Sequence, residues 1–272
     1  PSDSNIVATS GDDTTVRLWD ISIREMINIA NVEAPCRAVE WSPRGDLIGL
    51  GTGTGATDKG DGEEEKSGAI VLLNAESLEI VHEGRDSREW IHYARFSPDG
   101  KLFIVGSDDK EILVYDIAKG FKLKSKCQKH ASSVIAADFD KSSTWIRSNC
   151  ANNDLFYFRA NSGEVNAGGA SDLKDEEWHT FTTPCRWGTQ GVWSKNQRRS
   201  VNSSDVSKDG RLLAVRFFFG VIFFFFFGFA HWLIFLLLFS LFSLTLSPFR
   251  WCPSLENWKY SSIHVLTLVQ NQ

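Results

Sequence analysis

A pattern of short apolar runs separated by polar turns recurs four times along this chain of 272 residues. The last apolar run of each copy ends at residue 20, 74, 116 or 159, so the intervals are 54, 42 and 43 residues. A polar, Gly-rich stretch at 53–67 accounts for the longer first interval. A period near 42 lies within the range of about 40–45 residues that four-stranded propeller blades occupy. The repeat therefore predicts a β-propeller.

The apolar runs are predicted to be strands. They are short, rich in Val, Ile, Leu, Phe and Tyr, and bounded by Gly, Pro, Asp and Ser. After the Ser-Pro-Asp-Gly turn at 97–100, the runs 101–105 and 112–115 are apolar almost without alternation, which is typical of strands covered on both faces. We therefore predict an all-β fold without helices: a partial propeller of four to five irregular, four-stranded blades over residues 1–215.

The length and the start of the chain limit how much of a propeller it can contain. A seven-bladed ring needs roughly 300 residues at this period, and the repeats end near residue 215. Pro1 opens the chain in the middle of a repeat, and no signal peptide is found there. We expect a cytoplasmic fragment that is truncated at its N-terminus.

The composition excludes some classes of partner. The formal net charge is −5, whereas a nucleic-acid-binding surface would be basic, so we expect no nucleic acid. The five cysteines are scattered, odd in number and without metal-ligand spacing, which favours reduced, mostly buried thiols. They are Cys36, Cys127, Cys150, Cys185 and Cys252.

Several segments resemble parts of a WD40 repeat. Residues 14–20 (Thr-Thr-Val-Arg-Leu-Trp-Asp) resemble its signature strand, residues 10–13 the turn before it, and residues 129–134 its Gly-His entry. In that family a loop His, a turn Asp, a strand Ser/Thr and a strand Trp form a hydrogen-bonded set. This chain keeps the set poorly, because Arg85 stands where a His is expected and Asn152-Asn153 replace a turn Asp. The resemblance implies structural roles for Asp12, Asp13, Trp19, Asp20, Asp108, Asp109, Asp116 and His130.

A narrower resemblance connects the chain to the echinoderm microtubule-associated protein-like (EMAP-like) family. Residues 83–100 are similar to part of a family repeat, and residues 175–193 are similar to the atypical part of its second propeller. There an acidic-Glu-Trp-aromatic stretch leads to a Gly-Val-Trp, which ordinary WD40 repeats lack. The similarity covers roughly residues 5–215 and weakens at 194–204. It singles out Glu177, Trp178, Gly191 and Trp193 as family-specific positions.

The EMAP-like resemblance implies a non-catalytic scaffold in the cytoplasm, associated with the cytoskeleton. Its expected partners are tubulin, microtubules or other proteins. Lattice attachment in the family often depends on an N-terminal coiled-coil and basic region that this sequence does not contain. A generic WD40 adaptor with another partner is the alternative, and no residue is singled out for tubulin.

No motif favours an enzyme, a cofactor or a metal ion. The glycines at 49, 51, 53 and 55 are not followed by Gly-Lys-Ser/Thr or by a helix pattern, so we interpret them as a strand end leading into a loop. The acidic residues of 58–65 lack the spacing of a calcium loop. Residues 175–179 place carboxylates beside a His, but neighbours on a strand alternate faces.

A strongly apolar segment follows Val215. Residues 217–249 contain no Asp, Glu, Lys or Arg, and Phe occupies every position of 223–227. One interpretation is a transmembrane helix within 217–246, anchoring the propeller on the cytoplasmic side. We favour the other interpretation, a translated intron at 216–249, because pyrimidine-rich codons encode Phe, Leu and Ser. A short disordered tail is expected at 250–272.

Overall fold

The computed structural model describes residues 5–53, 67–186, 201–206, 212–217, 222–226 and 264–267. The chain divides into two compact units, Pro1–Trp187 and Gly188–Gln272, which we call unit 1 and unit 2. Each unit is built on antiparallel sheets whose neighbouring strands are consecutive in the sequence. The described residues therefore form an all-β fold, as the repeat predicts.

Unit 1 contains four sheets. The first has β1 (Ile6–Ser10), β2 (Thr15–Asp20) and β3 (Glu25–Asn31). The second has β4 (Cys36–Trp41), β5 (Leu47–Gly53), β6 (Gly68–Asn74) and β7 (Ile80–Ser87). The third has β8 (Ile91–Phe96), β9 (Leu102–Ser107), β10 (Glu111–Asp116) and β11 (Lys122–Gln128). The fourth has β12 (Val134–Phe139), β13 (Trp145–Cys150) and β14 (Leu155–Arg159).

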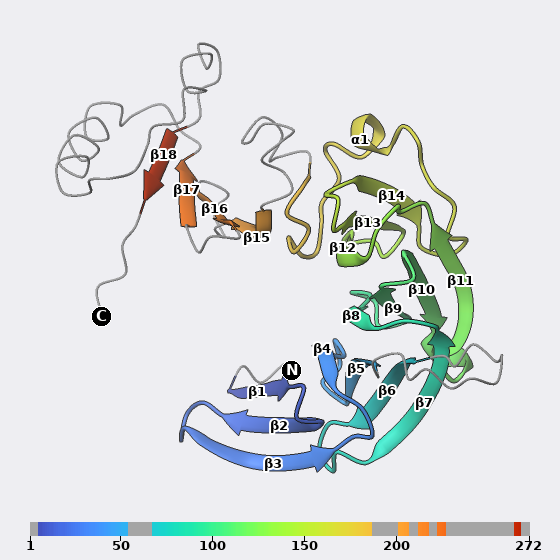
Figure 1. The fold of residues 1–272 in the computed structure, drawn as a ribbon, viewed down its shortest axis with the longest axis vertical. Coiled ribbons are helices and arrows are strands. Elements are labelled where there is room, and N and C mark those ends of the chain that lie inside the picture. Colours follow the sequence, from blue (N-terminus) through green and yellow to red (C-terminus); the bar gives the residue numbers. More distant parts are fainter. Residues whose placement is uncertain are drawn as a thin grey trace, which may run out of the picture. The chain divides into compact units, whose positions relative to one another are not determined.

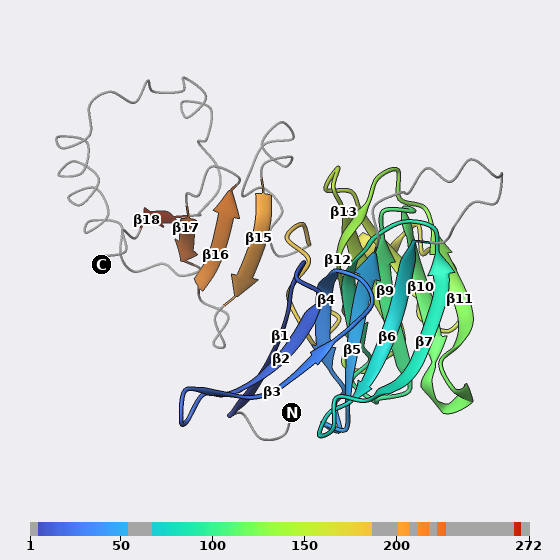
Figure 2. The same ribbon diagram turned by 60° about the horizontal axis from the view of Figure 1, so that its bottom comes forward.

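The sheets of unit 1 follow one another as propeller blades do. Figure 1 shows them along an arc, with β4, β8 and β12 on its inner side and β3, β7 and β11 on its outer side. Figure 2 shows that the strands of successive sheets run side by side. The fourth sheet has three strands, so the expected irregularity includes the strand number.

Apolar side chains fill the space between successive sheets. Val16 and Leu18 of the first sheet pack with Ile48, Leu50 and Leu73 of the second, and all five are buried. Similar clusters join the second sheet to the third and the third to the fourth. Each such side chain contributes about 1.5–3 kcal/mol through burial. An inner sheet is thus covered on both faces, which explains why its strands are apolar without alternation.

Glycines at alternate positions of β5 bring the second and third sheets close together. A Cβ atom added to Gly49 would lie 2.6 Å from the Phe103 ring, and one added to Gly51 would lie 2.4 Å from Ile91 Cγ2. These glycines lie within a strand, so residues 49–53 are not a phosphate loop. The absence of side chains on this face of β5 leaves room for the neighbouring blade.

Helices are few and short among the described residues. They are η1 (Ile117–Lys119), a 3₁₀ turn, and α1 (Gly169–Asp172). The prediction of an all-β fold is thus confirmed for the described residues. None of these helices is long and apolar enough to cross a membrane.

The described part of unit 2 is a sheet of β15 (Val201–Val206), β16 (Leu212–Phe217), β17 (Ile222–Phe226) and β18 (His264–Thr267). β16 pairs with β17 from Leu212↔Phe226 to Arg216↔Ile222. The first residues of the Phe run therefore form a strand, and the structure gives no support to a transmembrane helix there. The remainder of 217–246 and most of the predicted 250–272 tail lie outside the described residues.

Candidate functional site

Strand register identifies equivalent positions in successive blades. Thr14, Lys110 and Asn153 occupy one position in the turns β1–β2, β9–β10 and β13–β14, and each has a positive φ, between 60° and 70°. Counting back from the paired strands, Ser87 occupies the position of His130. The expectation that Arg85 stands at this position is wrong, because Arg85 lies two residues earlier, within β7.

Each of three blades keeps one contact of the WD40 hydrogen-bonded set. In the first blade, Trp19 Nε1 donates to Thr9 Oγ1 at 2.9 Å. In the third blade, Ser87 Oγ donates to Asp109 Oδ2 at 2.7 Å. In the fourth blade, His130 Nε2 and Ser148 Oγ are 2.7 Å apart, and Asn152-Asn153 occupy the Asp position of the turn. The set is thus distributed over the blades and is complete in none of the three.

The other predicted motif aspartates bind locally in turns. Asp13 accepts hydrogen bonds from the Thr15 backbone and hydroxyl and from Arg17, and the Arg17 contact is the main reason that its pKa is lowered to about 2. Asp20 accepts from Ser22 and closes the turn after β2. Asp116 forms longer ion pairs with two lysines, Lys119 at 3.6 Å and Lys124 at 3.8 Å.

His130 is buried in an apolar environment. Its ring lies 5.0 Å from Phe156 and 6.0 Å from Phe158, and only 7% of the residue is exposed. Burial lowers the pKa of His130 to about 4, although the nearby Asp154 acts in the opposite direction. The imidazole is therefore neutral in the folded protein at neutral pH and serves as a hydrogen-bonding structural group.

We expect the burial of His130 to make stability pH-dependent. Below about pH 6.5 the unfolded chain binds a proton at this residue, whereas the folded protein does so only near pH 4. Its contribution to the free energy of unfolding should fall by about 3 kcal/mol as the pH drops across that window. In urea titrations at several pH values, the free energy of unfolding should fall less steeply with decreasing pH for His130→Gln than for the control Lys129→Gln. Equal slopes for the two variants would contradict this assignment.

A β-bulge recurs in the innermost strand of each later blade. The pairing passes from Cys36 to Ala38 in β4 and from Ile91 to Tyr93 in β8, so Arg37 and His92 stand outside the regular ladder. The same shift places Ile135 in a bulge of β12. Bulges re-aim side chains and are frequent next to functional sites.

Polar contacts connect the bulged residues of β4 and β8 to neighbouring turns. Arg37 Nε donates to Asp12 Oδ1 at 3.1 Å, and His92 Nε2 lies 2.8 Å from Asp108 Oδ2. The Arg37 guanidinium lies 3.9 Å from the centre of the Trp90 ring. The Trp90 and His92 rings are stacked, with 6.4 Å between their centres. We call these five residues, Asp12, Arg37, Trp90, His92 and Asp108, the bulge rim.

The bulge rim has the composition of a protein-binding surface. It presents an Arg stacked on a Trp, and these residue types are enriched among those that dominate binding energy at interfaces. Arg37 and Asp12 keep 42% and 69% of their side-chain surface exposed. The motif resemblance identified Asp12 and Asp108 but missed Arg37, Trp90 and His92, because a bulge becomes visible only when strands are paired.

The family-specific segment lies along β12. The backbone of Trp178 forms an isolated antiparallel β-bridge with Asp140, and the backbone N–H of His179 donates to the Phe139 carbonyl. The Glu177 carboxylate pairs with Lys141 at 2.8 Å. Trp178 is buried beneath the guanidinium of Arg147, which lies 4.4 Å from the centre of its ring. Gly191 and Trp193, the other two family-specific positions, lie outside the described residues.

A buried aspartate holds this segment in place. Asp138 pairs with Arg147 at 3.0 Å and accepts hydrogen bonds from the hydroxyls of Thr180, Thr182 and Thr183 at 2.6–2.7 Å. Burial raises the pKa of Asp138, but Arg147 and these donors outweigh burial and keep that pKa below its ordinary value. The residue is thus an ionised anchor for 180–183.

The interaction network continues across the inner strands. Tyr93 Oη lies 3.1 Å from Thr182 Oγ1, Arg95 Nε donates to Tyr93 Oη at 2.7 Å, and Arg95 Nη1 lies 3.4 Å from Glu40 Oε1. Polar contacts therefore run from the second blade to the segment that covers the fourth. None of these groups forms a nucleophile–base pair.

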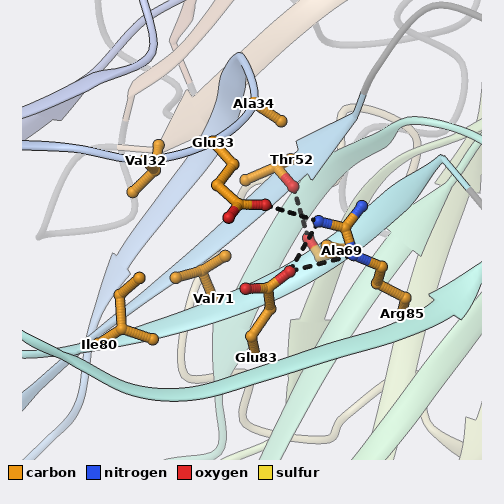
Figure 3. A pocket seen from close by; sticks show the side chains of 9 residues that line it. All are labelled: Val32, Glu33, Ala34, Thr52, Ala69, Val71, Ile80, Glu83 and Arg85. Carbon is orange, nitrogen blue, oxygen red and sulfur yellow. Dashed lines mark hydrogen bonds and ion pairs between the residues drawn. The ribbon is translucent and has the colours of Figure 1, made fainter.

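A small hollow lies between the first two blades. Figure 3 shows Arg85 pointing toward Glu33 and Glu83. Arg85 Nη2 lies 3.2 Å from Glu33 Oε2 and 2.8 Å from Glu83 Oε1. Its free interior of about 10 Å³ has room for about one water molecule. The hollow is too small for an organic ligand. It is lined by Val32, Glu33, Ala34, Thr52, Ala69, Val71, Ile80, Glu83 and Arg85.

The described residues contain no group of three or more His, Cys, Asp or Glu side chains that could hold a metal ion. The four described cysteines are buried, and burial raises the pKa of Cys36 and of Cys127 to about 12. Such thiols are poor nucleophiles at neutral pH. Glu177, two residues before His179, is paired with Lys141 at the surface.

Comparison with known proteins gives a consistent family. A family model described as the echinoderm microtubule-associated protein second beta-propeller matches residues 1–230 and thus continues past Val215. The ciliary WD repeat-containing protein ctxp80 of Euplotoides octocarinatus is 27% identical over 78% of this chain and 31% of its own length. Echinoderm microtubule-associated protein-like 2 of Homo sapiens is 28% identical over 76% of this chain and 30% of its own.

The 77 kDa echinoderm microtubule-associated protein of Strongylocentrotus purpuratus is 27% identical over 76% of this chain and 29% of its own length. The chain thus spans about three tenths of the length of these relatives. The family model, however, covers far more than half of the chain itself. On that basis the chain belongs to the echinoderm microtubule-associated protein family.

Proposed function

We propose that this chain is a non-catalytic scaffold that binds tubulin or microtubule-associated partners through the bulge rim. The observation that carries the proposal is the stacking of Arg37 on Trp90 at 3.9 Å, held by Asp12 on one side and extended by the His92–Asp108 pair on the other. A pair of an exposed Arg and a half-buried Trp that is already ordered loses little side-chain entropy on binding. The names of the family relatives, which describe them as microtubule-associated, favour this class of partner.

The proposed role places the protein in the cytoplasm, associated with the cytoskeleton. Partner binding by loops and bulges on a rigid β scaffold needs no cofactor, since the apolar packing between blades fixes the positions of the rim residues. Because the proposed site is a surface, substitutions that leave the fold intact can test it.

We expect Arg37→Ala to weaken binding of soluble tubulin about tenfold, because it removes both the guanidinium and its contact with Trp90. The matched control is Arg44→Ala, an exposed arginine in the turn between β4 and β5 at the other end of the same sheet. Isothermal titration calorimetry, with tubulin dimers titrated into the whole chain, measures the affinity of each variant.

Two results would contradict the proposal. One is a folded chain that does not bind tubulin, which would favour an adaptor for another partner. The other is an equal loss of affinity for the Arg37 and Arg44 variants, which would place the binding surface elsewhere. Circular dichroism of each variant confirms that the sheets are retained.

A further inference from the structure

The outer strand of the third blade carries a lysine at every second position. Lys122, Lys124 and Lys126 of β11 are exposed, and we call them the β11 lysines. Residues 117–137 contain five lysines and no Asp or Glu, although the formal net charge of the chain is −5. β11 is therefore a basic strand on an acidic protein, and a local field of one sign attracts partners of the other.

Strand register shows that these lysines are not a general property of the outer strands. A β-bulge interrupts β3, β7 and β11 at the same place in their pairing with β2, β6 and β10. The bulged residues of the three strands are Ile27, Val81 and Lys124. Two residues before the bulge the chain has Glu25, Glu79 and Lys122. Two residues after the bulge it has Ile29, Glu83 and Lys126.

Protection of a sheet edge does not account for this difference. Lysines on edge strands commonly prevent pairing with another chain. In the described residues, β3, β7 and β11 each lie at the end of their sheet, so each would need such protection. The bulged residues of β3 and β7 are nevertheless aliphatic, with Ile27 47% and Val81 54% exposed. The β11 lysines therefore point to a role that belongs to the third blade.

The bulge distributes the lysines over both faces of β11. Lys122 lies opposite Asp116, and Lys126 lies opposite Leu113. Asp116 and Leu113 are three positions apart on β10, so they face opposite sides of the sheet. Lys124 stands between them in the bulge. The ammonium groups thus flank the outer edge of the strand from both sides.

The fourth blade holds β11 in place. Ser125 Oγ donates to the Ala160 carbonyl at 3.5 Å. A Cβ atom added to Gly163 would lie 2.4 Å from the Lys126 carbonyl oxygen, so the turn after β14 packs directly on the strand. The backbone that carries the lysines is therefore ordered before a partner binds, which lowers the entropy cost of binding.

The charges of the β11 lysines are only partly matched within the chain. Lys126 Nζ lies 3.4 Å from Glu111 Oε2, and Lys124 Nζ lies 3.8 Å from Asp116 Oδ2. Both distances exceed the roughly 2.7–2.9 Å of a charge-assisted hydrogen bond. Lys122 forms no ion pair with another described residue. Ammonium donors thus remain available to an external carboxylate.

We propose that the β11 lysines bind an extended acidic segment of a partner protein, whose Asp and Glu carboxylates accept hydrogen bonds from the ammonium groups. Complementary charge supplies the selectivity and speeds association. β11 lies on the outer side of the arc in Figure 1, whereas the bulge rim belongs to the inner strands and their turns. The two surfaces are distinct, so this interaction does not depend on tubulin binding at the rim.

A synthetic peptide of alternating Glu and Ser, about ten residues long, is the probe. Fluorescence anisotropy with the whole chain should show saturable binding that weakens at least tenfold between about 50 and 300 mM salt. A peptide of alternating Gln and Ser should not bind. Amide hydrogen exchange of the unaltered chain should show added protection at Lys122–Gln128 when the Glu peptide is present.

A matched pair of triple variants separates a site from overall charge. Replacing the three β11 lysines with Gln should weaken binding of the Glu peptide at least tenfold. The control replaces three exposed lysines elsewhere with Gln and changes the net charge equally, so its affinity should stay within about twofold. The control lysines are Lys101, Lys141 and Lys174.

Four results would overturn the proposal. They are absence of saturable binding, equal losses in the two triple variants, protection confined to segments other than β11, and tighter binding of a single-stranded oligonucleotide or an anionic lipid vesicle than of the Glu peptide. The last result would assign β11 to another class of partner. Because hydrogen exchange uses the unaltered chain, its outcome stands even where a triple variant fails to fold.

Discussion

Asp138→Ala is expected to lower the free energy of unfolding by about 3–5 kcal/mol. Removing the carboxylate leaves the Arg147 guanidinium buried without its counter-charge, at 4% side-chain exposure. It also removes the acceptor for the hydroxyls of Thr180, Thr182 and Thr183. Because small domains are stable by only about 5–15 kcal/mol in total, the loss should be large in urea unfolding.

The family-specific segment should respond to the same substitution. Once Asp138 is lost, Thr180, Thr182 and Thr183 lose the carboxylate that holds them to β12, so limited proteolysis should cut there first. Asp175→Ala is the control, since this side chain is 89% exposed and its loss should change stability by less than about 0.5 kcal/mol. Equal stability of the two variants would show that Asp138 does not anchor the segment.

Gly51→Val is expected to have the second-largest effect, a loss of about 1–3 kcal/mol or more. The first added carbon alone would lie 2.4 Å from Ile91 Cγ2 and 3.1 Å from Ala38 Cβ. Both neighbours belong to inner strands, so the second and third blades would have to separate. Thermal unfolding should show a clearly lower Tm than that of the unaltered chain.

The control for Gly51 is a glycine in an outer strand. A Cβ added to Gly84 of β7 would meet the flexible ends of His82 and Ile70 at 3.3 Å, which can adjust. Gly84→Ala should therefore shift the Tm much less than Gly51→Ala or Gly51→Val. A similar shift in Tm at both positions would contradict the claim that close packing of the second and third blades at β5 limits stability.

The repeat period was sufficient to predict the fold class, because each blade is a local unit in the sequence. The turns at 97–100 and 106–109, the apolar runs and the family resemblance all lead to the observed sheets. Strand number was not predictable in this way. The fourth blade has three strands, and the region after β14 contains α1 and the segment fixed by Asp138.

The candidate site was predicted less completely than the fold. Motif resemblance identifies residues such as Trp19 and His130 by their position in a repeat, and these make mainly structural contacts. Arg37 and Trp90 are 53 positions apart and belong to different blades, so only the packing of blades reveals their stacking. The misplacement of Arg85 has the same origin, because register depends on a bulge that the sequence does not mark.

The end of the propeller region after Val215 stays a prediction. β16 continues to Phe217, β17 pairs with it, and the family model extends to residue 230. Sequencing of spliced transcripts across this position tests the intron hypothesis directly. A continuous exon encoding the Phe run would contradict it.

The central claim is that the bulge rim is the partner-binding surface. Amide hydrogen exchange of the whole chain with and without soluble tubulin tests it most directly. We predict added protection in the loops β1–β2, β7–β8 and β9–β10, which surround Arg37 and Trp90. Protection confined to the opposite turns, at 42–46 and 97–101, would contradict the claim.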